Sequence, residues 1–323
     1  MNTILVITEN DAGRRLDRVL RKAMPDIPLS GIHKMLRKKR ILLDGKKAQP
    51  STKTASGQKI IIEGNAASFA SETLASPSNK VLKDECHSAQ CAPALPPIEP
   101  LILFEGGGIL VLNKIAGIAS HGDNSLETQV RAYLEHKITK SLSFKSGPLH
   151  RLDKPTSGVI TFSTSLDGAQ KFSAILAEGK LKKTYIAIFD GLMQDCKWHD
   201  FLVRDNNTKK TFVQNENSKD GKEAICEVRV IANNAKQSLA FVIIKTGRTH
   251  QIRASASFHG HPLSGDKKYG SMSKPPFFLH ALSLEFPDES FGVKKITAPL
   301  PHEWGGKDWK DLVRDAIYRT TKK

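Results

Sequence analysis

The sequence changes character between Gly64 and Pro100, and this change limits the folds that are open to the chain. Segments such as "NAASFASETLASPSNK" and "APALPPIEP" are rich in Ala, Ser and Pro and poor in aromatic residues. That composition is typical of a flexible linker, which the prolines stiffen towards its end. We therefore predict a small domain at 1–63, a linker at 64–100 and a larger domain at 101–323.

Positive charge is the second constraint, and it is concentrated before the linker. The whole chain of 323 residues has 49 Lys and Arg against 33 Asp and Glu, a formal net charge of +16. Between Arg14 and Glu63 alone there are 14 Lys and Arg against 4 Asp and Glu, which gives +10. Such a local excess favours a polyanionic partner, and nucleic acid is the usual one. The alternative is a basic surface that only keeps the protein in solution.

Other features narrow the class of protein. No run of residues approaches the roughly 20 apolar residues that a membrane span needs, and the first residues lack the basic region of a signal peptide. The four cysteines are too few for a disulfide framework in a chain of this size, and Cys86 and Cys91 lack zinc-site spacing. We expect a cytoplasmic protein with reduced thiols, no membrane association and no metal.

The basic segment is expected to combine two short amphipathic helices with a hairpin. The first helix covers about Arg14 to Met24, and the second runs from Gly31 to Arg40 with Ser30 as its N-cap. Asp44-Gly45 lies between short strands, where this pair is typical of a tight turn. Residues predicted to face a small core are Leu16, Val19, Leu20, Ala23, Ile32, Met35 and Leu36. Residues left to contact the phosphates of a nucleic acid are Arg15, Arg18, Lys34, Arg37, Lys38 and Arg40.

After the linker, "LILFEGGGILVLNKIAG" opens the larger domain with two apolar runs around a glycine turn. The three glycines lack the spacing of a nucleotide-binding loop, so a hairpin is the better interpretation. From Leu101 onward, apolar strands alternate with short amphipathic helices, which is typical of a domain that mixes both elements.

The segment "PLHRLDKPTSGVI" carries the first candidate for chemistry. Pro155 and Gly158 disfavour a regular element, so Asp153 is predicted to lie on an irregular loop before a strand. Arg151 and Lys154 are close in sequence and would keep this carboxylate ionised. An ionised carboxylate without a second acid nearby suggests a nucleophile or a stabiliser of positive charge. The alternative is an ordinary aspartate that makes loop hydrogen bonds.

Two later segments add to this candidate. "LKKTYIAIFDG" alternates as a strand and carries Tyr185 on one face. "IIKTGRTHQIRASASFHG" ends a strand at Lys245 and begins a helix near Thr249 that Gly260 can end. Arg248 and Arg253 flank a polar His-Gln pair, where an ordinary core helix would be apolar.

Taken together, these segments resemble the pseudouridine synthases of the RluA type. "HRLDKPTSG", "KKTYIAIFDG" and "GRTHQIR" match the three motifs of that family in order, as do "NKIAG", "GHPLSGDKKYG" and "FLHALSLEF". The basic segment at 1–63 resembles the S-four-like (alpha-L) RNA-binding module. The presence of this module together with the synthase motifs points to RluC-like members of the family, which act on large-subunit ribosomal RNA. Ile115 replaces the proline usual in "NKIAG". The resemblance implies an α+β protein with a small S-four-like domain and a large mixed-sheet catalytic domain.

The same resemblance implies roles for single residues. Asp153 would be the catalytic carboxylate, with Arg253 as its ion-pair partner and Tyr185 stacked on the uracil. The target base must leave the helix, because an enzyme cannot reach it while it is stacked. Arg151 would fill the vacated space with His150 beside it, and Arg248 would contact the RNA. The reaction needs no cofactor, and we expect a monomer whose partner is 23S ribosomal RNA.

Two other classes of protein remain open at this stage. One is a non-catalytic RNA-binding ribosome-assembly factor that keeps the fold, which would be expected to lack one of the three catalytic residues. The other is an aminoacyl-tRNA synthetase with the same RNA-binding module, suggested by "SMSKPP" but without a histidine-rich ATP-binding signature.

Overall fold

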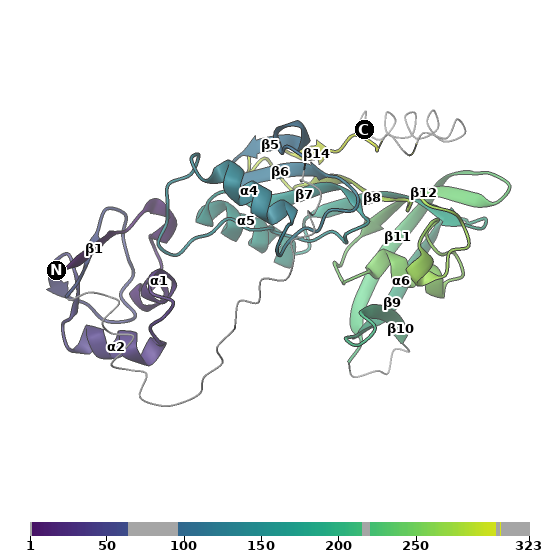
Figure 1. The fold of residues 1–323 in the computed structure, drawn as a ribbon. Coiled ribbons are helices and arrows are strands. Elements are labelled where there is room, and N and C mark those ends of the chain that lie inside the picture. The colour runs from purple at the N-terminus through teal and green to yellow at the C-terminus, as the bar shows by residue number, and fades with distance from the viewer. Residues whose placement is uncertain (1, 64–95, 215–219, 302–303, 305–323) are drawn as a thin grey trace, which may run out of the picture. The chain divides into compact units, whose positions relative to one another are not determined.

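The computed structural model describes residues 2–63, 96–214, 220–301 and 304 (Figure 1). The chain forms two compact units. The first consists of Met1–Pro96, Arg131–Ser146 and Thr164–Asp167, and the second of Pro97–Val130, Gly147–Ser163 and Gly168–Lys323. This division differs from the predicted one, because two segments from within 101–323 belong to the first unit.

The first unit contains two short helices and a four-stranded sheet of order β1-β4-β2-β3. Its elements are β1 (Thr3–Val6), the 3-10 turn η1 (Glu9–Asp11), α1 (Leu16–Ala23), α2 (Leu29–Arg37), β2 (Ile41–Leu43), β3 (Lys46–Lys47) and β4 (Lys59–Ile62). The predicted turn between β2 and β3 is confirmed, with Asp44 at φ 51° and Gly45 at φ 74°. The predicted apolar stripes also form the core of this unit, although Ala23 is only partly buried.

The start of α2 differs from the prediction. The helix begins at Leu29 with Pro28 as its N-cap, so Ser30 lies within the first turn. The carbonyl of Pro28 accepts the first helical hydrogen bond, from the N–H of Ile32 at 3.1 Å. Pro28 is extended, with φ −63° and ψ 153°, and the fixed φ of proline suits the entry to a helix.

A buried carboxylate explains why part of 131–146 belongs to the first unit. Asp11 is 0% exposed. Its Oδ1 accepts hydrogen bonds from the hydroxyls of Ser141 and Ser143, both at 2.6 Å, and from the N–H of Ser143 at 2.8 Å. Burial alone would raise the pKa of Asp11, but these hydrogen bonds and one from Thr8 hold that pKa at about 2.

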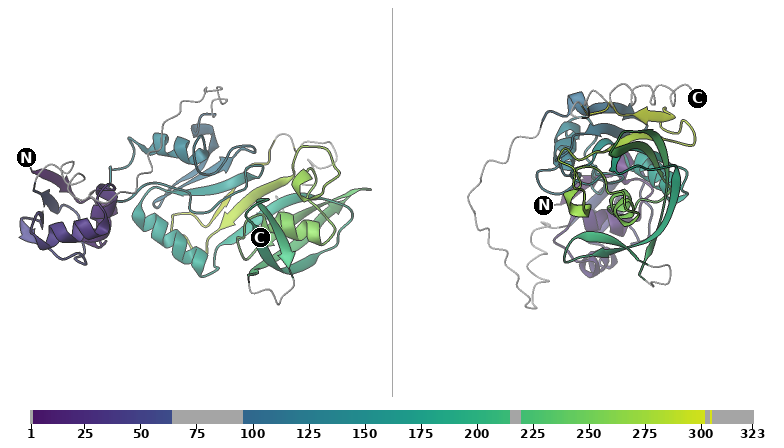
Figure 2. Two further views of the ribbon diagram at one scale, coloured as in Figure 1. Left: turned by 60° about the horizontal axis from the view of Figure 1, so that its bottom comes forward. Right: turned by 90° about the vertical axis from the view of Figure 1, so that its right-hand side faces the viewer.

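The second unit is built on one ten-stranded mixed sheet, with the strand order β10-β9-β11-β12-β8-β13-β7-β6-β5 and β14 beside β13. Its strands are β5 (Ile102–Gly106), β6 (Ile109–Lys114), β7 (Ser157–Ser163), β8 (Lys182–Asp190), β9 (Cys196–Asp205), β10 (Lys210–Gln214), β11 (Lys222–Asn233), β12 (Gln237–Ile244), β13 (Leu279–Glu285) and β14 (Lys295–Thr297). Figure 2 lets the sheet be followed from two sides. The hairpin predicted around the glycines is confirmed by β5 and β6.

The remaining helices are η2 (Glu99–Leu101), α4 (Leu126–Leu134), α5 (Leu166–Ala177), α6 (Gln251–Phe258) and η3 (Lys267–Tyr269). The end of α4 and the start of α5 are assigned to the first unit, and the other helical residues to the second. Phe172 of α5 packs with Phe286 and Phe291 in one apolar cluster. Ala254 of α6 packs with Leu202 in a second cluster, beside β9 and β10 (Figure 1). Ile98 and Leu101 are buried, so folded structure begins before the predicted end of the linker at 100.

The middle of the sheet positions the loop that carries Asp153. Strand β7 is buried throughout and lies between β6 and β13. Its pairing with β13 is parallel, whereas the other strand pairs in the described part of the chain are antiparallel. The segment before β7 therefore emerges beside β8 and β13, which carry Tyr185 and Ala281 opposite each other.

Some of the features predicted from the sequence lie outside the described residues. These are most of the predicted linker and both Cys86 and Cys91. Cys196 and Cys226 are free thiols. Within the part of the chain that the structure describes, no helix has the length and hydrophobicity that crossing a bilayer requires.

Gly158 tests the close contact between β7 and β13. Its φ is +107°, and a Cβ at this position would lie 2.2 Å from the carbonyl oxygen of Ala281. We expect Gly158→Ala to lower the free energy of unfolding by about 2 to 4 kcal/mol, since it adds backbone strain and a steric clash. Urea unfolding followed by circular dichroism measures this.

Gly147→Ala is the matched control for that substitution. A Cβ there would have its nearest contact at 3.7 Å, an ordinary van der Waals distance. Equal unfolding midpoints for the two variants would contradict the proposed clash.

Candidate active site

Asp153 lies at the edge of a small pocket in the second unit. The pocket is lined by Arg151, Leu152, Asp153, Thr156, Tyr185, Ile244, Arg248, His250, Gln251, Ile252, Arg253 and Leu279. The three predicted catalytic residues are therefore brought together from three separate segments of the sequence. The side chain of Asp153 is 23% exposed, so a ligand can still reach the carboxylate.

Backbone hydrogen bonds fix the loop that carries Asp153. The N–H of Thr156 donates to the carbonyl of Asp153 at 3.0 Å. On the preceding residue, the carbonyl of Leu152 accepts from the hydroxyl of Ser120 at 2.8 Å. The loop is thus held on both sides of the carboxylate without using the carboxylate itself.

Lys114 supports the same loop through its side chain. Its ammonium group is fully buried and donates to the carbonyls of Ile115, Ile118 and Lys154 at 3.1, 2.7 and 3.0 Å. Burial lowers the pKa of Lys114 to about 7, although the charge of Asp153 acts in the opposite direction. This role was not predicted from the sequence, because a lysine after a strand is usually exposed.

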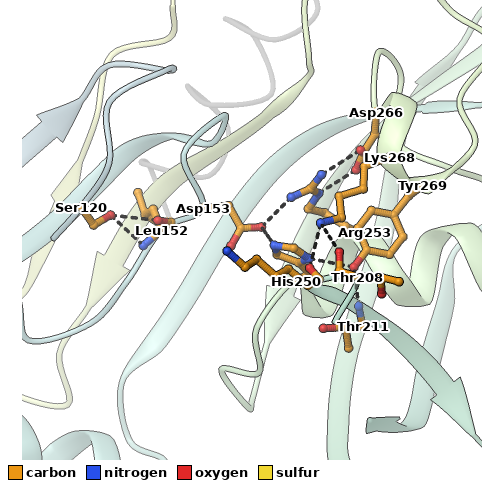
Figure 3. A network of polar contacts seen from close by, with 11 residues as sticks. Ser120, Leu152, Asp153, Thr208, Thr211, His250, Arg253, Asp266, Lys268 and Tyr269 are labelled. Atoms are coloured by element: carbon orange, nitrogen blue, oxygen red, sulfur yellow. Dashed lines mark hydrogen bonds and ion pairs between the residues drawn. The ribbon is translucent and has the colours of Figure 1, made fainter. Parts of the chain in front are cut away.

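Arg253 lies between two carboxylates, as Figure 3 shows. Its Nη1 donates to Oδ2 of Asp153 at 3.1 Å, which confirms the predicted pair across 100 positions of sequence. Its Nε and Nη2 donate to the two oxygens of Asp266 at 2.7 and 2.8 Å. The side chains of Arg253 and Asp266 are 7% and 2% exposed. Burial alone would lower the pKa of Arg253, but Asp266 and Asp153 together raise it, so the guanidinium stays charged.

Tyr185 faces the pocket from the middle of β8. Its side chain is buried, and burial together with the charge of Asp153 raises the pKa of its hydroxyl well above the ordinary value. The phenol is therefore neutral at physiological pH, and its ring is available for stacking on a planar ligand.

Two predicted RNA contacts lie at the pocket and one does not. Arg151 and Arg248 are exposed and line it. His150 is turned away, because its imidazole stacks on Phe172 with ring centroids 5.9 Å apart. Its Nε2 accepts a hydrogen bond from the N–H of Thr161 at 3.1 Å, and burial lowers its pKa to about 3. This packing gives no support to the predicted RNA contact of His150.

The predicted RNA contacts of the first unit are mostly solvent-exposed. Arg18, Lys34, Arg37 and Lys38 are exposed, and Arg40 is partly buried. Arg15 is engaged with Asp17, since its Nη2 lies 2.7 Å from that carboxylate. This pairing was not expected from the sequence, and it offsets part of the charge of Arg15.

Three residues in the polar network around Asp153 were not predicted from the sequence. Asp266 orients Arg253, and His250 has its Nε2 3.8 Å from Oδ2 of Asp153. Tyr269 forms a hydrogen bond with His250 at 2.8 Å between Oη and Nδ1 (Figure 3). All three lie in segments that the resemblance had matched, "GRTHQIR" and "GHPLSGDKKYG", which was the available signal. Among the described residues, no group of acidic, His and Cys side chains could hold a metal ion.

Comparison with known proteins agrees with this geometry. The family model described as RNA pseudouridylate synthase matches residues 108–258, which contain Asp153, Tyr185 and Arg253. "Ribosomal large subunit pseudouridine synthase C" of Rickettsia bellii is 29% identical over 315 residues, covering 92% of this chain and 98% of that protein. The protein of the same name from Escherichia coli strain K12 is 29% identical over 313 residues and 92% of each chain. This chain is therefore similar to the RNA pseudouridylate synthases across 108–258 and to two ribosomal large subunit pseudouridine synthases over 92% of its length.

Two solved structures share the fold of the second unit. The human RNA Pseudouridylate Synthase Domain Containing 4 matches with a TM-score of 0.55 at 20% identity, over 64% of this chain and 91% of its own. The human RNA Pseudouridylate Synthase Domain Containing 1 matches with a TM-score of 0.51 at 24% identity, over 62% of this chain and 83% of its own. The predicted large mixed sheet of a pseudouridine synthase is thereby confirmed.

Asp266 offers a test of how the pocket is held. We expect Asp266→Asn to lower the free energy of unfolding by about 3 kcal/mol, because the buried guanidinium loses a charged partner that held it at two points. Activity per folded molecule should also fall, since Arg253 can then move away from Asp153.

Thermal unfolding and activity at saturating RNA, measured on the same preparation, separate these two effects. Asp288→Asn, on an exposed turn, is the matched control. Unchanged unfolding in Asp266→Asn would contradict the role given to this residue.

Proposed function

We propose that this protein converts uridine to pseudouridine in large-subunit ribosomal RNA. The observation that carries the proposal is the ion pair of Asp153 and Arg253 at a pocket that also contains the buried Tyr185. The relatives named above are ribosomal large subunit pseudouridine synthases, and they match over almost the whole chain. A non-catalytic assembly factor is not favoured, because all three residues that the reaction would use are present and adjacent.

The reaction requires a carboxylate that stays charged in a site shielded from water. The N1–C1′ glycosidic bond breaks, uracil turns over, a C5–C1′ bond forms, and the proton on C5 passes to solvent while N1 gains one. Arg253 compensates the desolvation of Asp153, which would otherwise favour the neutral acid. The carboxylate can then either add to C1′ or remove the proton on C2′, and both routes use the same ionised group.

Tyr185 is proposed to hold the uracil during its rotation. The aromatic face can stack on the base, and the neutral phenol can exchange a hydrogen bond near C5. The uracil is detached from the sugar at this stage. Stacking on the ring of Tyr185 would keep the base near the sugar without a covalent bond. Leu279 and Ile244 complete the apolar lining on which such exclusion of water depends.

The nucleotide must be flipped out of its helix before it can enter the pocket, at a cost of a few kcal/mol. Arg151 is the proposed group that fills the vacated space, because it is exposed at the rim two residues before Asp153. Arg248 is a second cation at the rim and would contact the RNA backbone. Its Nε donates to the carbonyl of Glu223 at 2.9 Å, which fixes the direction of the guanidinium.

We further propose that the first unit is an S-four-like RNA-binding domain. Its two helices, its hairpin and its exposed Arg18, Lys34, Arg37 and Lys38 support this. Such cations contact phosphates and release counterions, so they contribute affinity that does not depend on sequence. The choice of uridine would then depend on RNA shape around the flipped base.

Asp153→Asn should abolish isomerisation, because an amide can neither add to C1′ nor accept a proton there. The measurement is tritium release to water from RNA labelled at C5 of uridine. Asp288→Asn, remote in sequence and on an exposed turn, should match the wild type. Equal tritium release from Asp153→Asn and the wild type would end the enzyme proposal in favour of a binding protein.

Salt dependence tests the proposed role of the first unit. Replacing Arg37 and Lys38 together with Gln should reduce the slope of log affinity against log salt by about 2, roughly one for each phosphate that is no longer neutralised. Lys236→Gln, on an exposed turn of the second unit, is the control. An unchanged slope in the double variant, measured by filter binding between low and moderate salt, would show that these side chains do not bind phosphate.

A further inference from the structure

His250 has an unusual backbone conformation directly beside the catalytic carboxylate. It is the N-cap of α6 and lies in the left-handed region, at φ 54° and ψ 24°. For a residue other than glycine this costs of order 1 kcal/mol or more, and such strain gathers at functional sites. The imidazole is well buried, with 13% of the side chain exposed, and it lines the pocket. This conformation directs attention to what the ring contacts.

The ring is the middle of a chain of polar contacts that begins on the edge strand β10, with two hydrogen bonds on one side and a longer contact with Asp153 on the other. The N–H of Thr211 donates to Oη of Tyr269 at 2.9 Å, and this oxygen lies 2.8 Å from Nδ1 of His250. At the other end of the ring, Nε2 lies 3.8 Å from Oδ2 of Asp153. Figure 3 shows the path from Thr211 through Tyr269 and His250 to Asp153.

One assignment of the protons places a hydrogen on each side of the His250 ring, towards Asp153 and towards Tyr269. If the proton were on Nδ1, the bare lone pair of Nε2 would face the carboxylate of Asp153, and the hydroxyl proton of Tyr269 would lose its acceptor in the chain. If Tyr269 donates to Nδ1 instead, Nε2 carries the proton and points a donor at Asp153. Burial raises the pKa of Tyr269, so its hydroxyl keeps the proton that it must donate.

The surroundings keep the ring neutral. Burial lowers the pKa of His250, as do the charges of Arg253 on α6, Lys268 on η3 and Arg204 on β9, and only the charge of Asp153 acts in the opposite direction. A neutral ring leaves Asp153 with one full positive partner, Arg253, and one dipolar donor.

Tyr269 orients both partners of Asp153. Its side chain is almost fully buried, and its ring packs against the guanidinium of Arg253 at 4.9 Å while its hydroxyl meets His250. Lys268 supports the contacts near Thr211, at the far end from Asp153. Its ammonium donates to the carbonyl of Lys209 at 2.8 Å and so ties η3 to the turn before β10. This keeps Thr211 in position to hold the hydroxyl of Tyr269.

We propose that His250 is a positioning residue for Asp153, held as the neutral Nε2–H tautomer by the chain from Thr211 through Tyr269. Arg253 and His250 both address Oδ2. The carboxylate is therefore fixed through one oxygen, and Oδ1 is left for the nucleoside. The expected effect on the rate rests on the proposed isomerase function. The tautomer of His250 and its contacts are properties of the free protein and do not depend on that function.

The structural content is tested by nuclear magnetic resonance on the free protein labelled with 15N in histidine. At neutral pH we expect Nδ1 of His250 to give the shift of an unprotonated nitrogen and Nε2 that of a protonated one. In Tyr269→Phe, which keeps the ring and removes the hydroxyl, the two shifts should move towards each other as both tautomers are populated. Protonated Nδ1 in the wild type, or an unchanged spectrum in Tyr269→Phe, would overturn the proposal even if the protein is an isomerase.

The kinetic consequence is tested by single-turnover isomerisation at saturating RNA. We expect His250→Ala to lower the rate on the order of 10- to 100-fold through misplacement of Asp153, with RNA affinity unchanged. His250→Gln, whose amide can supply an N–H donor, should recover most of the rate. His199→Ala, at an exposed histidine paired with Glu223, is the matched control.

A rate in His250→Ala equal to that of the wild type would refute the role in positioning. Failure of Gln to recover any rate, with the fold intact by its spectrum, would also refute it. If the wild type itself releases no tritium, the proposed function fails, and the resonance experiment still decides the tautomer.

Discussion

The side chain of Arg253 holds two carboxylates at once, and the geometry of the pocket follows from that. Its contacts with Asp266 are short, buried and made at two points, so they fix the plane of the guanidinium. The remaining Nη1 is then directed at Asp153. A single arginine bound only to Asp153 could follow that carboxylate in several rotamers, whereas one held by Asp266 imposes its own position on it. Three charges of alternating sign thus share the desolvation cost that any one of them would bear alone.

The sheet explains how these residues meet. Strand β7 runs parallel to β13 and antiparallel to β6, so the loop before β7 reaches the side of the sheet where β8 presents Tyr185. Helix α6 packs over β9 and β10 and contributes His250 and Arg253 from its first turn. The site is therefore assembled without a long loop inserted between these elements. Its charged groups lie on short loops and a helix end, all tied to a rigid sheet.

Charge is used differently in the two units. In the second unit, Arg253 and Lys114 are buried and direct their donors at specific acceptors. In the first unit the exposed Arg18, Lys34, Arg37 and Lys38 lie on the surface of a small apolar core. Buried cations fix geometry, while exposed ones attract a polyanion over a distance set by screening. The total of +16 does not distinguish these two uses.

The sequence alone predicted the class of fold, many of the local elements and the candidate reacting residues. Periodicity located the helices of the first unit, and Asp44-Gly45 located its turn, because these signals depend on neighbouring residues only. The motifs around Asp153, Tyr185 and Arg253 carried the resemblance to the family, and one pairing, Asp153 with Arg253, was predictable from it. Other features depend on contacts between distant segments, which no local pattern records. Only the packing of β7, β8, β10 and α6 decided the role of Asp266, the burial of Lys114, the stacking of His150 on Phe172 and the proposed tautomer of His250. Each of these depends on which groups are excluded from water and on which partners remain for them.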